Sequence, residues 1–241
     1  MEGGEKVKPL AIDLFCGLGG WTEGLLAEGY DVIGFDITRH QYGEHRYPSL
    51  LVIQDVTTLH GSQFKNAALI VASPPCQQYS YRAMPWKKAK ALPPPDNTLF
   101  EACFRIQREA CEAAGRYIPM IIENVRGAQK WVGRARWNFG SFYLWGDVPA
   151  LMPPVAHVKV KGLNWAAYGK SGYKPKGFNV TAAQNFRRDH AGIKSGGDWF
   201  NASQPSISRL TSSKSDSRKA ASAMIAKIPL PLSRHIAASF R

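Results

Sequence analysis

The sequence predicts an α/β fold in which a doubly wound, mostly parallel sheet carries helices on both faces. Short apolar runs alternate with helical patterns through residues 1–147 of the 241-residue chain, as is typical of this fold class. The apolar runs are nearly continuous, which is expected of strands that helices cover on both sides. Hydrophobic residues make up 44% of the chain, enough for the core of one large domain.

Each element follows from its local pattern. The clearest helix, at 97–115, has one apolar stripe with a 3.6-residue period. Asp96 or Asn97 can cap its start and Gly115 can end it. In chain order, we expect a strand at 9–15, a helix at 21–29, strands at 30–35, 50–53 and 68–72, the helix at 97–115, strands at 118–123 and 141–145, a helix at 218–228, a break at 229–231 and a last helix at 232–240.

Positive charge is concentrated in the last part of the chain. Residues 1–147 hold 16 Lys and Arg against 15 Asp and Glu, a net charge of +1, whereas residues 148–241 hold 15 against 3, a net charge of +12. Aromatic residues are spread through this basic part, which favours contact with nucleic acid over a merely solvated surface. We expect three parts, namely a first domain at 9–147, a small, basic, loop-rich insert at 149–216 and C-terminal helices at 217–241.

Composition excludes several classes of protein. No run of about 18 apolar residues is present, which excludes a transmembrane helix. The polar N-terminus has no apolar signal region, so we expect a cytoplasmic protein. The four cysteines form no Cys-x-x-Cys pair and have no histidine pair at a ligand spacing, so we expect free thiols and no metal site.

A glycine-rich turn, Asp13-Leu-Phe-Cys-Gly-Leu-Gly-Gly20, joins the first expected strand to the first helix. Glycines let a ligand approach the backbone, and the N-terminus of the helix offers free N–H groups. Asp36 ends the second strand, where a carboxylate can bind both hydroxyls of a ribose. The pattern therefore favours an adenosine-containing cofactor, and a merely tight turn is the alternative.

Cys76 follows a buried strand in the stretch Ser73-Pro-Pro-Cys-Gln-Gln-Tyr-Ser80. Two prolines exclude a helix until the chain has left the strand, so the thiol lies at the carboxyl end of the sheet, where ligands bind in this fold class. A thiolate at that place can act as a nucleophile.

Glu123 ends the apolar strand Ile121-Ile-Glu-Asn-Val125, at the same edge of the sheet as Cys76. A charge there is costly, so we expect this carboxyl group to be functional. A carboxylate that caps the following turn is the alternative.

These motifs together resemble the cytosine-5 DNA methyltransferase family. The glycine-rich turn resembles its first cofactor motif, the Pro-Cys-Gln of 75–77 its nucleophile motif, and Glu123-Asn-Val125 its Glu-Asn-Val motif. The segment Ile225–Leu232 resembles the segment that returns to the cofactor pocket in that family. The match covers 11–126 in the family's order and resumes at about residue 218.

The sequence also departs from the family pattern. Only Val132-Gly-Arg-Ala-Arg136 matches the motif Gln-x-Arg-x-Arg; the glutamine is missing, and the match lies closer to Glu-Asn-Val than expected. The terminal Gly-Asn is replaced by Ile225-Ala226, which puts one cofactor contact in doubt. The region for target recognition is small, as in compact, phage-like enzymes.

The resemblance implies methyl transfer from S-adenosylmethionine, with S-adenosylhomocysteine as product, to C5 of a flipped-out cytosine in double-stranded DNA. It implies that Cys76 attacks C6, that Glu123 contacts N3, and that Arg134 and Arg136 hold the carbonyl oxygen or a phosphate. The residues expected to bind the cofactor are Asp13, Phe15, Gly17, Gly19, Gly20, Trp21, Asp36, Ile37, Asp55, Val56 and Pro74. Those expected to bind DNA are Gln77, Ser80, Arg82, Lys87, Lys88, Arg187 and Arg188.

Two other functions stay open. A tRNA cytosine-5 methyltransferase would carry nearly the same motifs, and a decayed relative would bind DNA without catalysis, although the intact Cys76 and Glu123 count against decay. We expect the 9–147 domain to bind cofactor and catalyse, 149–216 to recognise the target, 217–241 to return to the first domain, and the enzyme to be a monomer. A restriction-linked, an orphan and a phage-protective role are equally compatible with the sequence.

Overall fold

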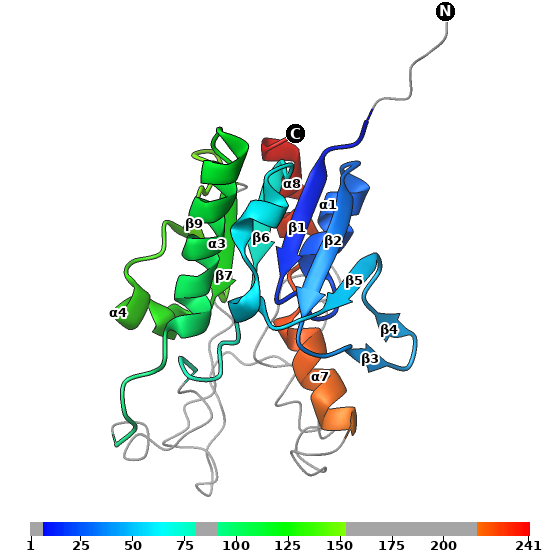
Figure 1. Cartoon of the computed structure of the whole chain (residues 1–241). Coiled ribbons are helices and arrows are strands. Elements are labelled where there is room, and N and C mark those ends of the chain that lie inside the picture. The colour runs from blue at the N-terminus through cyan, green and yellow to red at the C-terminus, as the bar shows by residue number, and fades with distance from the viewer. Residues whose placement is uncertain (1–6, 81–90, 153–215) are drawn as a thin grey trace, which may run out of the picture. The chain divides into compact units, whose positions relative to one another are not determined.

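A computed structural model describes residues 7–80, 91–152 and 216–241 of the chain (Figure 1). The chain divides into two compact units, one of residues 1–153 with 226–241 and one of residues 154–225. The first unit contains the sheet, whereas the helix α7 (Asp216–Ala226) falls almost wholly in the second. In the described part of the chain, no helix is both long and apolar enough to cross a lipid bilayer.

One seven-stranded sheet forms the centre of the first unit. Its strands lie in the order β5-β2-β1-β6-β7-β9-β8; the first five are parallel, and β9 runs antiparallel to both of its neighbours. A separate hairpin pairs β3 with β4. The strands are β1 (Leu10–Leu14), β2 (Asp31–Asp36), β3 (Gln41–Tyr42), β4 (His45–Arg46), β5 (Leu50–Ile53), β6 (Leu69–Ala72), β7 (Met120–Asn124), β8 (Trp137–Phe139) and β9 (Phe142–Gly146).

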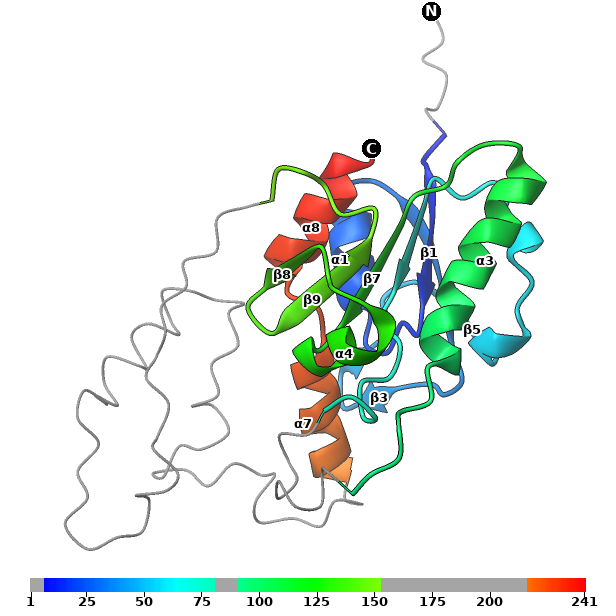
Figure 2. The same cartoon turned by 90° about the vertical axis from the view of Figure 1, so that its left-hand side faces the viewer.

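Helices cover both faces of this sheet, as Figure 2 shows in an edge-on view. On one face, α1 (Gly20–Ala27) packs against α8 (Leu230–Ser239). On the other, α3 (Thr98–Ala114) packs against the short 3₁₀ helices η1 (Val56–Thr58) and η2 (Gly61–Phe64). The remaining short helices are η3 (Arg126–Ala128) and α4 (Gln129–Val132). The predicted fold class, an α/β fold with a doubly wound and mostly parallel sheet, is confirmed.

The strand register brings the carboxyl ends of the central strands level with one another. Leu14 of β1 lies opposite Phe35 of β2 and Ala72 of β6, and Ala72 lies opposite Ile122 of β7. Residues that directly follow these positions therefore meet at one edge of the sheet, where α/β proteins bind their ligands.

The structure differs from the predicted elements in several places. The short helices η1, η2, η3 and α4 were not predicted, and α7 spans Asp216–Ala226 where a helix was expected at 218–228. The two-residue strands β3 and β4 and the three-residue strand β8 were not predicted, because so short a run has no periodicity of its own. The last helix was predicted to begin at residue 232 but begins at Leu230, with Pro231 in its first turn. Proline is tolerated there because the first N–H groups of a helix have no partner within the helix.

Candidate active site

The glycine-rich loop leaves β1 in a strained conformation. Phe15 has a φ of 56°, in the left-handed region that a residue with a side chain enters at a cost of about 1–3 kcal/mol. Gly17 and Gly19 follow with φ values of 50° and 75°. A Cβ on Gly17 would meet no atom within 4 Å, so the space over this residue is open. Strain of this kind persists where the surrounding structure fixes the chain, and here it shapes a loop at the ligand-binding edge.

Asp36 connects this loop to the end of β2. Its Oδ2 accepts a hydrogen bond from the Gly17 N–H at 2.9 Å, and its Oδ1 accepts one from the Thr38 N–H at 3.1 Å. The His40 imidazole lies 3.5 Å from Oδ1. Burial raises the pKa of Asp36, but the His40 side chain and the two backbone N–H groups outweigh it and hold that pKa below its ordinary value. Asp36 is therefore an ionised acceptor at neutral pH.

Asp13 is completely buried one strand away. The Thr22 hydroxyl donates to Asp13 Oδ2 at 2.7 Å, and the Tyr47 hydroxyl lies 2.6 Å from the same Thr22 oxygen. Thr22 has one hydroxyl proton, which it gives to Asp13, so Tyr47 donates to Thr22. Asp13 Oδ1 has no hydrogen-bond partner among the described residues. Burial raises the pKa of Asp13 to about 7, against the opposing effect of Thr22.

Ile37 and Asp55 complete this half of the edge. Ile37, directly after β2, is 68% exposed although it is a large apolar residue. Asp55 precedes η1, and its Oδ1 accepts hydrogen bonds from the N–H and the hydroxyl of Thr57. Val56, the next residue, is buried. An exposed apolar side chain at an edge that also carries two carboxylates suits a flat, partly polar ligand group such as a purine ring.

The C-terminal segment lies against the start of α1. A Cβ on Gly20 would come within 2.3 Å of the Ile228 backbone nitrogen, so only glycine permits this approach. The Lys227 ammonium pairs with the Glu23 carboxylate in the first turn of α1. Segments about 200 residues apart in the sequence thus meet beside the glycine-rich loop.

Cys76 begins a turn just beyond β6. Cys76 is half-buried, and its carbonyl accepts a hydrogen bond from the Tyr79 N–H at 3.0 Å. The Tyr79 hydroxyl donates to Asn97 Oδ1 at the start of α3. On the other side, the Trp21 indole donates to the Ser73 hydroxyl at 3.0 Å, which ties α1 to the same loop. The loop that carries Cys76, residues 73–80, is therefore attached to both helical layers.

Glu123 and Asn124 end the neighbouring strand β7. Glu123 is buried, with 9% of its surface exposed, and Asn124 is buried beside it. The Asn124 side-chain amide donates to the Pro74 carbonyl at 2.9 Å, two residues before Cys76. The bond fixes the loop that carries the thiol to the strand that carries the carboxyl group, so Cys76 and Glu123 are held at the same edge.

Arg134 and Arg136 lie between α4 and β8 and are exposed. The Arg136 N–H donates to the Leu144 carbonyl, but neither guanidinium group has a hydrogen bond or ion pair within the described residues. Of the residues expected to bind DNA, Gln77 is exposed and Ser80 half-exposed. The others lie outside the described residues, namely Arg82, Lys87, Lys88, Arg187 and Arg188.

The acceptors at the ends of β2 and β5 fit S-adenosylmethionine. The space over Gly17 is open, Asp36 is ionised, and within the described residues Asp55 Oδ2 makes no hydrogen bond. A cationic cofactor with ribose hydroxyls can use such acceptors. Among the described residues, no cluster of three His, Cys, Asp or Glu side chains could hold a metal ion.

Sequence reasoning missed the residues that hold others in place. The sequence assigns no role to Asn124, although it stands directly beside Glu123 in the Glu-Asn-Val motif. Thr22 and Tyr47 were missed because a buried hydroxyl that bonds a carboxylate leaves no sequence pattern. His40 lies four residues after Asp36, a spacing that is informative on a helix but not in this loop.

The chain was compared with protein families, curated sequences and solved structures. Curated protein sequences gave no match. Among solved structures, a DNA modification methyltransferase encoded within an E. coli prophage is 27% identical, with a TM-score of 0.35, over 52% of this chain and 34% of that one. Entamoeba histolytica EhMeth is 20% identical, with a TM-score of 0.36, over 52% of this chain and 40% of that one. S. pombe Dnmt2 is 18% identical, with a TM-score of 0.35, over 52% of this chain and 36% of that one.

The part of this chain that aligns thus covers only 34–40% of the length of each of these solved proteins. A family model matches residues 10–133, more than half of the chain, and covers the glycine-rich loop, Cys76 and Glu123. That family transfers methyl groups from S-adenosylmethionine to cytosine C5. The chain therefore belongs to the C-5 cytosine-specific DNA methylase family.

Proposed function

We propose that this protein is an active DNA (cytosine-5) methyltransferase that forms a covalent adduct between Cys76 and C6 of a flipped-out cytosine in duplex DNA. The observation that supports this most is the hydrogen bond from Asn124 to the Pro74 carbonyl. It joins the loop that carries Cys76 to the strand of Glu123, so a thiol and a carboxyl group are held together at the ligand-binding edge.

Each residue of the pair has a chemical task. Attack of the Cys76 thiolate on C6 removes the aromaticity of cytosine and makes C5 nucleophilic. Negative charge then develops toward N3, where the Glu123 carboxyl group at the end of β7 supplies or shares a proton. Arg134 and Arg136, exposed and unpaired among the described residues, take the carbonyl oxygen or a phosphate.

The cofactor site is assigned to the other half of the edge. S-adenosylmethionine, when bound, supplies an electrophilic methyl group to C5. Asp36 takes the ribose hydroxyls, Ile37 and Asp55 face the base, and the buried Asp13 supports the site through the hydrogen bond that it accepts from Thr22 of α1. The remaining residues assigned to the cofactor site are Phe15, Gly17 and Gly19 in the loop, Gly20 and Trp21 at the start of α1, Val56 of η1, and Pro74 after β6.

Duplex DNA is the proposed substrate because residues 148–241 carry a net charge of +12. Charge of this sign binds phosphates, and a base within a duplex must be flipped out to reach a thiol at a sheet edge. The proposed DNA contacts of Arg187 and Arg188 belong to this basic part, and those of Gln77, Ser80, Arg82, Lys87 and Lys88 to the segment after the thiol.

A covalent trap tests the proposal directly. The protein is incubated with labelled S-adenosylmethionine and a pool of duplexes that contain 5-fluorocytosine, and in parallel with tRNA that contains the same base. A denaturation-resistant adduct with DNA that is absent from Cys76→Ser supports the proposal. An adduct with tRNA alone would make the protein a tRNA methyltransferase, and no adduct with either would make it a binding protein without catalysis.

A further inference from the structure

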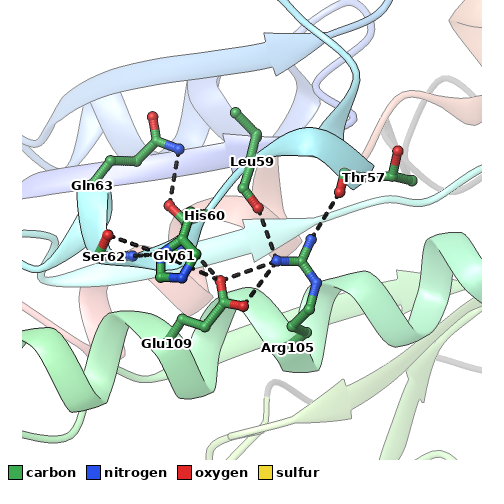
Figure 3. A network of polar contacts seen from close by, with 8 residues as sticks. All are labelled: Thr57, Leu59, His60, Gly61, Ser62, Gln63, Arg105 and Glu109. Carbon is green, nitrogen blue, oxygen red and sulfur yellow. Dashed lines mark hydrogen bonds and ion pairs between the residues drawn. The ribbon is translucent and has the colours of Figure 1, made fainter.

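Helix α3 holds the segment that carries Asp55 through a compact polar network, shown in Figure 3. This segment, residues 55–64, contains η1 and η2 and joins β5 to β6 without a strand or a long helix of its own. Its main chain is therefore held by other parts of the protein. Two α3 residues one turn apart, Arg105 and Glu109, supply these contacts.

Arg105 binds two carbonyl groups of the segment. One guanidinium nitrogen, Nη2, donates to the Thr57 carbonyl at 3.0 Å, and the other, Nη1, donates to the Leu59 carbonyl at 2.9 Å. Nη1 also lies 3.0 Å from both oxygens of the Glu109 carboxylate. The planar guanidinium group thus fixes the spacing of the two carbonyls, as a flexible ammonium group would not.

Glu109 binds the next turn of the same segment. Its Oε2 accepts a hydrogen bond from the Gly61 N–H at 2.6 Å. A Cβ on Gly61 would come within 2.0 Å of the Ile106 carbonyl, so the segment rests directly on the backbone of α3. Burial raises the pKa of Glu109, but the Gly61 N–H and the Arg105 side chain outweigh it, and the pKa lies below its ordinary value.

The network is not a hydrolytic triad, although it contains a serine, a histidine and a glutamate. The same ring nitrogen, His60 Nδ1, faces both the Ser62 hydroxyl at 2.8 Å and Glu109 Oε2 at 3.9 Å. A triad needs the serine and the acid on opposite ring nitrogens. The arrangement therefore serves to hold the main chain in place.

Thr57 connects the network to Asp55. Its carbonyl accepts from Arg105, while its N–H and hydroxyl both donate to Asp55 Oδ1, at 2.9 and 2.8 Å. Within the described residues, Asp55 Oδ2 makes no hydrogen bond and is available to a ligand. A shift of Thr57 would therefore move the Asp55 carboxylate.

From these contacts we infer that Arg105 and Glu109 are positioning residues for the cofactor, because they hold Thr57 and, through it, the Asp55 carboxylate in the geometry that binds the adenosine part of S-adenosylmethionine. The inference rests on the proposed function for the identity of the cofactor. It adds two residues on α3 that touch neither cofactor nor DNA.

The test compares Arg105→Ala with Arg116→Ala. Arg116 also donates from Nη2 to a main-chain carbonyl, that of Ala67 at 2.8 Å, but before β6, at the opposite edge of the sheet. We expect Arg105→Ala to weaken S-adenosylhomocysteine binding about ten-fold in calorimetry, and to raise KM for S-adenosylmethionine with little change in kcat. Arg116→Ala should lower the melting temperature to a similar extent and leave affinity for the cofactor unchanged.

A double-mutant cycle with Asp55→Ala identifies the route of the effect. If Arg105 acts through Asp55, then Arg105→Ala should weaken binding less than about two-fold in the Asp55→Ala background, because the carboxylate that it positions is gone. Additive losses, an affinity within two-fold of wild type for Arg105→Ala, or an equal loss in Arg116→Ala would each overturn the inference.

Glu109→Gln keeps the test decisive if Arg105→Ala fails to fold. The amide oxygen still accepts from the Gly61 N–H, but the ion pair with Arg105 is lost, so we expect a two- to five-fold weaker binding of S-adenosylhomocysteine. Binding that matches wild type would overturn the inference. A wild-type protein that binds S-adenosylhomocysteine but methylates neither DNA nor tRNA would refute the proposed catalysis and leave the positioning role standing.

Discussion

The two halves of the ligand-binding edge hold their functional groups in different ways. In the cofactor half, at the ends of β1, β2 and β5, three carboxylates accept hydrogen bonds from neighbouring residues, Asp13 from Thr22, Asp36 from Gly17, and Asp55 from Thr57. In the substrate half, at the ends of β6 and β7, the bonds fix the main chain that carries the thiol.

The difference fits the ligands of the two halves. A small cofactor of constant structure is bound best by side chains that are already in place, because little conformational entropy is then lost on binding. A base that arrives from a duplex needs a fixed nucleophile, and we propose that the exposed cations Arg134 and Arg136 bind its carbonyl oxygen or a phosphate. Four substitutions, taken from the largest expected effect to the smallest, test this division.

Cys76→Ser should abolish methyl transfer and leave the cofactor half intact. The hydroxyl is a far weaker nucleophile than a thiolate, so turnover should fall on the order of 10⁴-fold. The affinity for S-adenosylhomocysteine and the melting temperature should match wild type. Turnover above about one hundredth of wild type, measured with labelled cofactor, would show that another residue attacks cytosine.

Asp13→Asn should reverse a pH-dependent loss of stability. The pKa of Asp13 is raised from 3.8 to about 7 by burial, so between these values the folded chain holds a proton that the unfolded chain releases. The free energy of unfolding therefore falls as pH rises from 4 to 7, by up to about 4 kcal/mol, and stays low above pH 7. Asparagine never ionises and removes this loss.

The measurement is urea unfolding of wild type and variant at pH 4.5 and pH 8. The stability of Asp13→Asn relative to wild type should be higher at pH 8 than at pH 4.5. Asp31→Asn, at an exposed carboxylate 3.9 Å from the Lys8 ammonium, is the matched control; it keeps Asp13, so its stability should fall between the two pH values as that of wild type does. Parallel curves for Asp13→Asn and wild type would mean that Asp13 ionises normally in the folded chain.

Asp36→Ala should weaken S-adenosylmethionine binding about 10- to 100-fold and leave DNA affinity unchanged. The substitution removes the ribose acceptor and also the bond that fixes the Gly17 N–H. Calorimetry with the cofactor and a DNA-binding titration separate the two effects. An unchanged affinity for the cofactor would move the ribose contact elsewhere, with Glu44 and Asp55 as the next candidates.

Much of the fold could be predicted because its strongest signals are local. The helix α3 was expected at 97–115 and spans Thr98–Ala114, since its apolar stripe, its start and the left-handed Gly115 after it all agree. Strand β5 has the predicted bounds, 50–53. At the start of the last helix the only signal was Pro231, and the predicted start at residue 232 was wrong, because α8 begins at Leu230.

The candidate site could be predicted only in part, for a physical reason. Asp36, Cys76 and Glu123 follow apolar strands, so the sequence places them at one edge. Two contacts that position this edge are side-chain bonds to main-chain carbonyls, Arg105 to Thr57 and Asn124 to Pro74. Every residue offers a carbonyl, so a bond of this kind has no complementary residue type that a sequence could reveal.

Asn124→Ala should reduce turnover because it releases the loop that carries Cys76, and it should leave cofactor binding unaffected. The variant leaves the buried Pro74 carbonyl without its donor, at a cost of about 1–3 kcal/mol in stability, and frees the loop to move relative to Glu123. We expect kcat to fall about ten-fold, while the affinity for S-adenosylhomocysteine, which depends on the other half of the edge, stays within two-fold.

Asn138→Ala is the matched control for this last substitution. Its side-chain amide donates to the Gly140 carbonyl at 3.1 Å, the same kind of bond, but at an exposed turn between β8 and β9. It should leave kcat and stability nearly unchanged, because water can replace an exposed donor. If Asn124→Ala weakened cofactor binding as strongly as it slowed turnover, the two halves of the edge would respond together. The division between a half whose carboxylates are held in place and a half whose main chain is held in place would then be wrong.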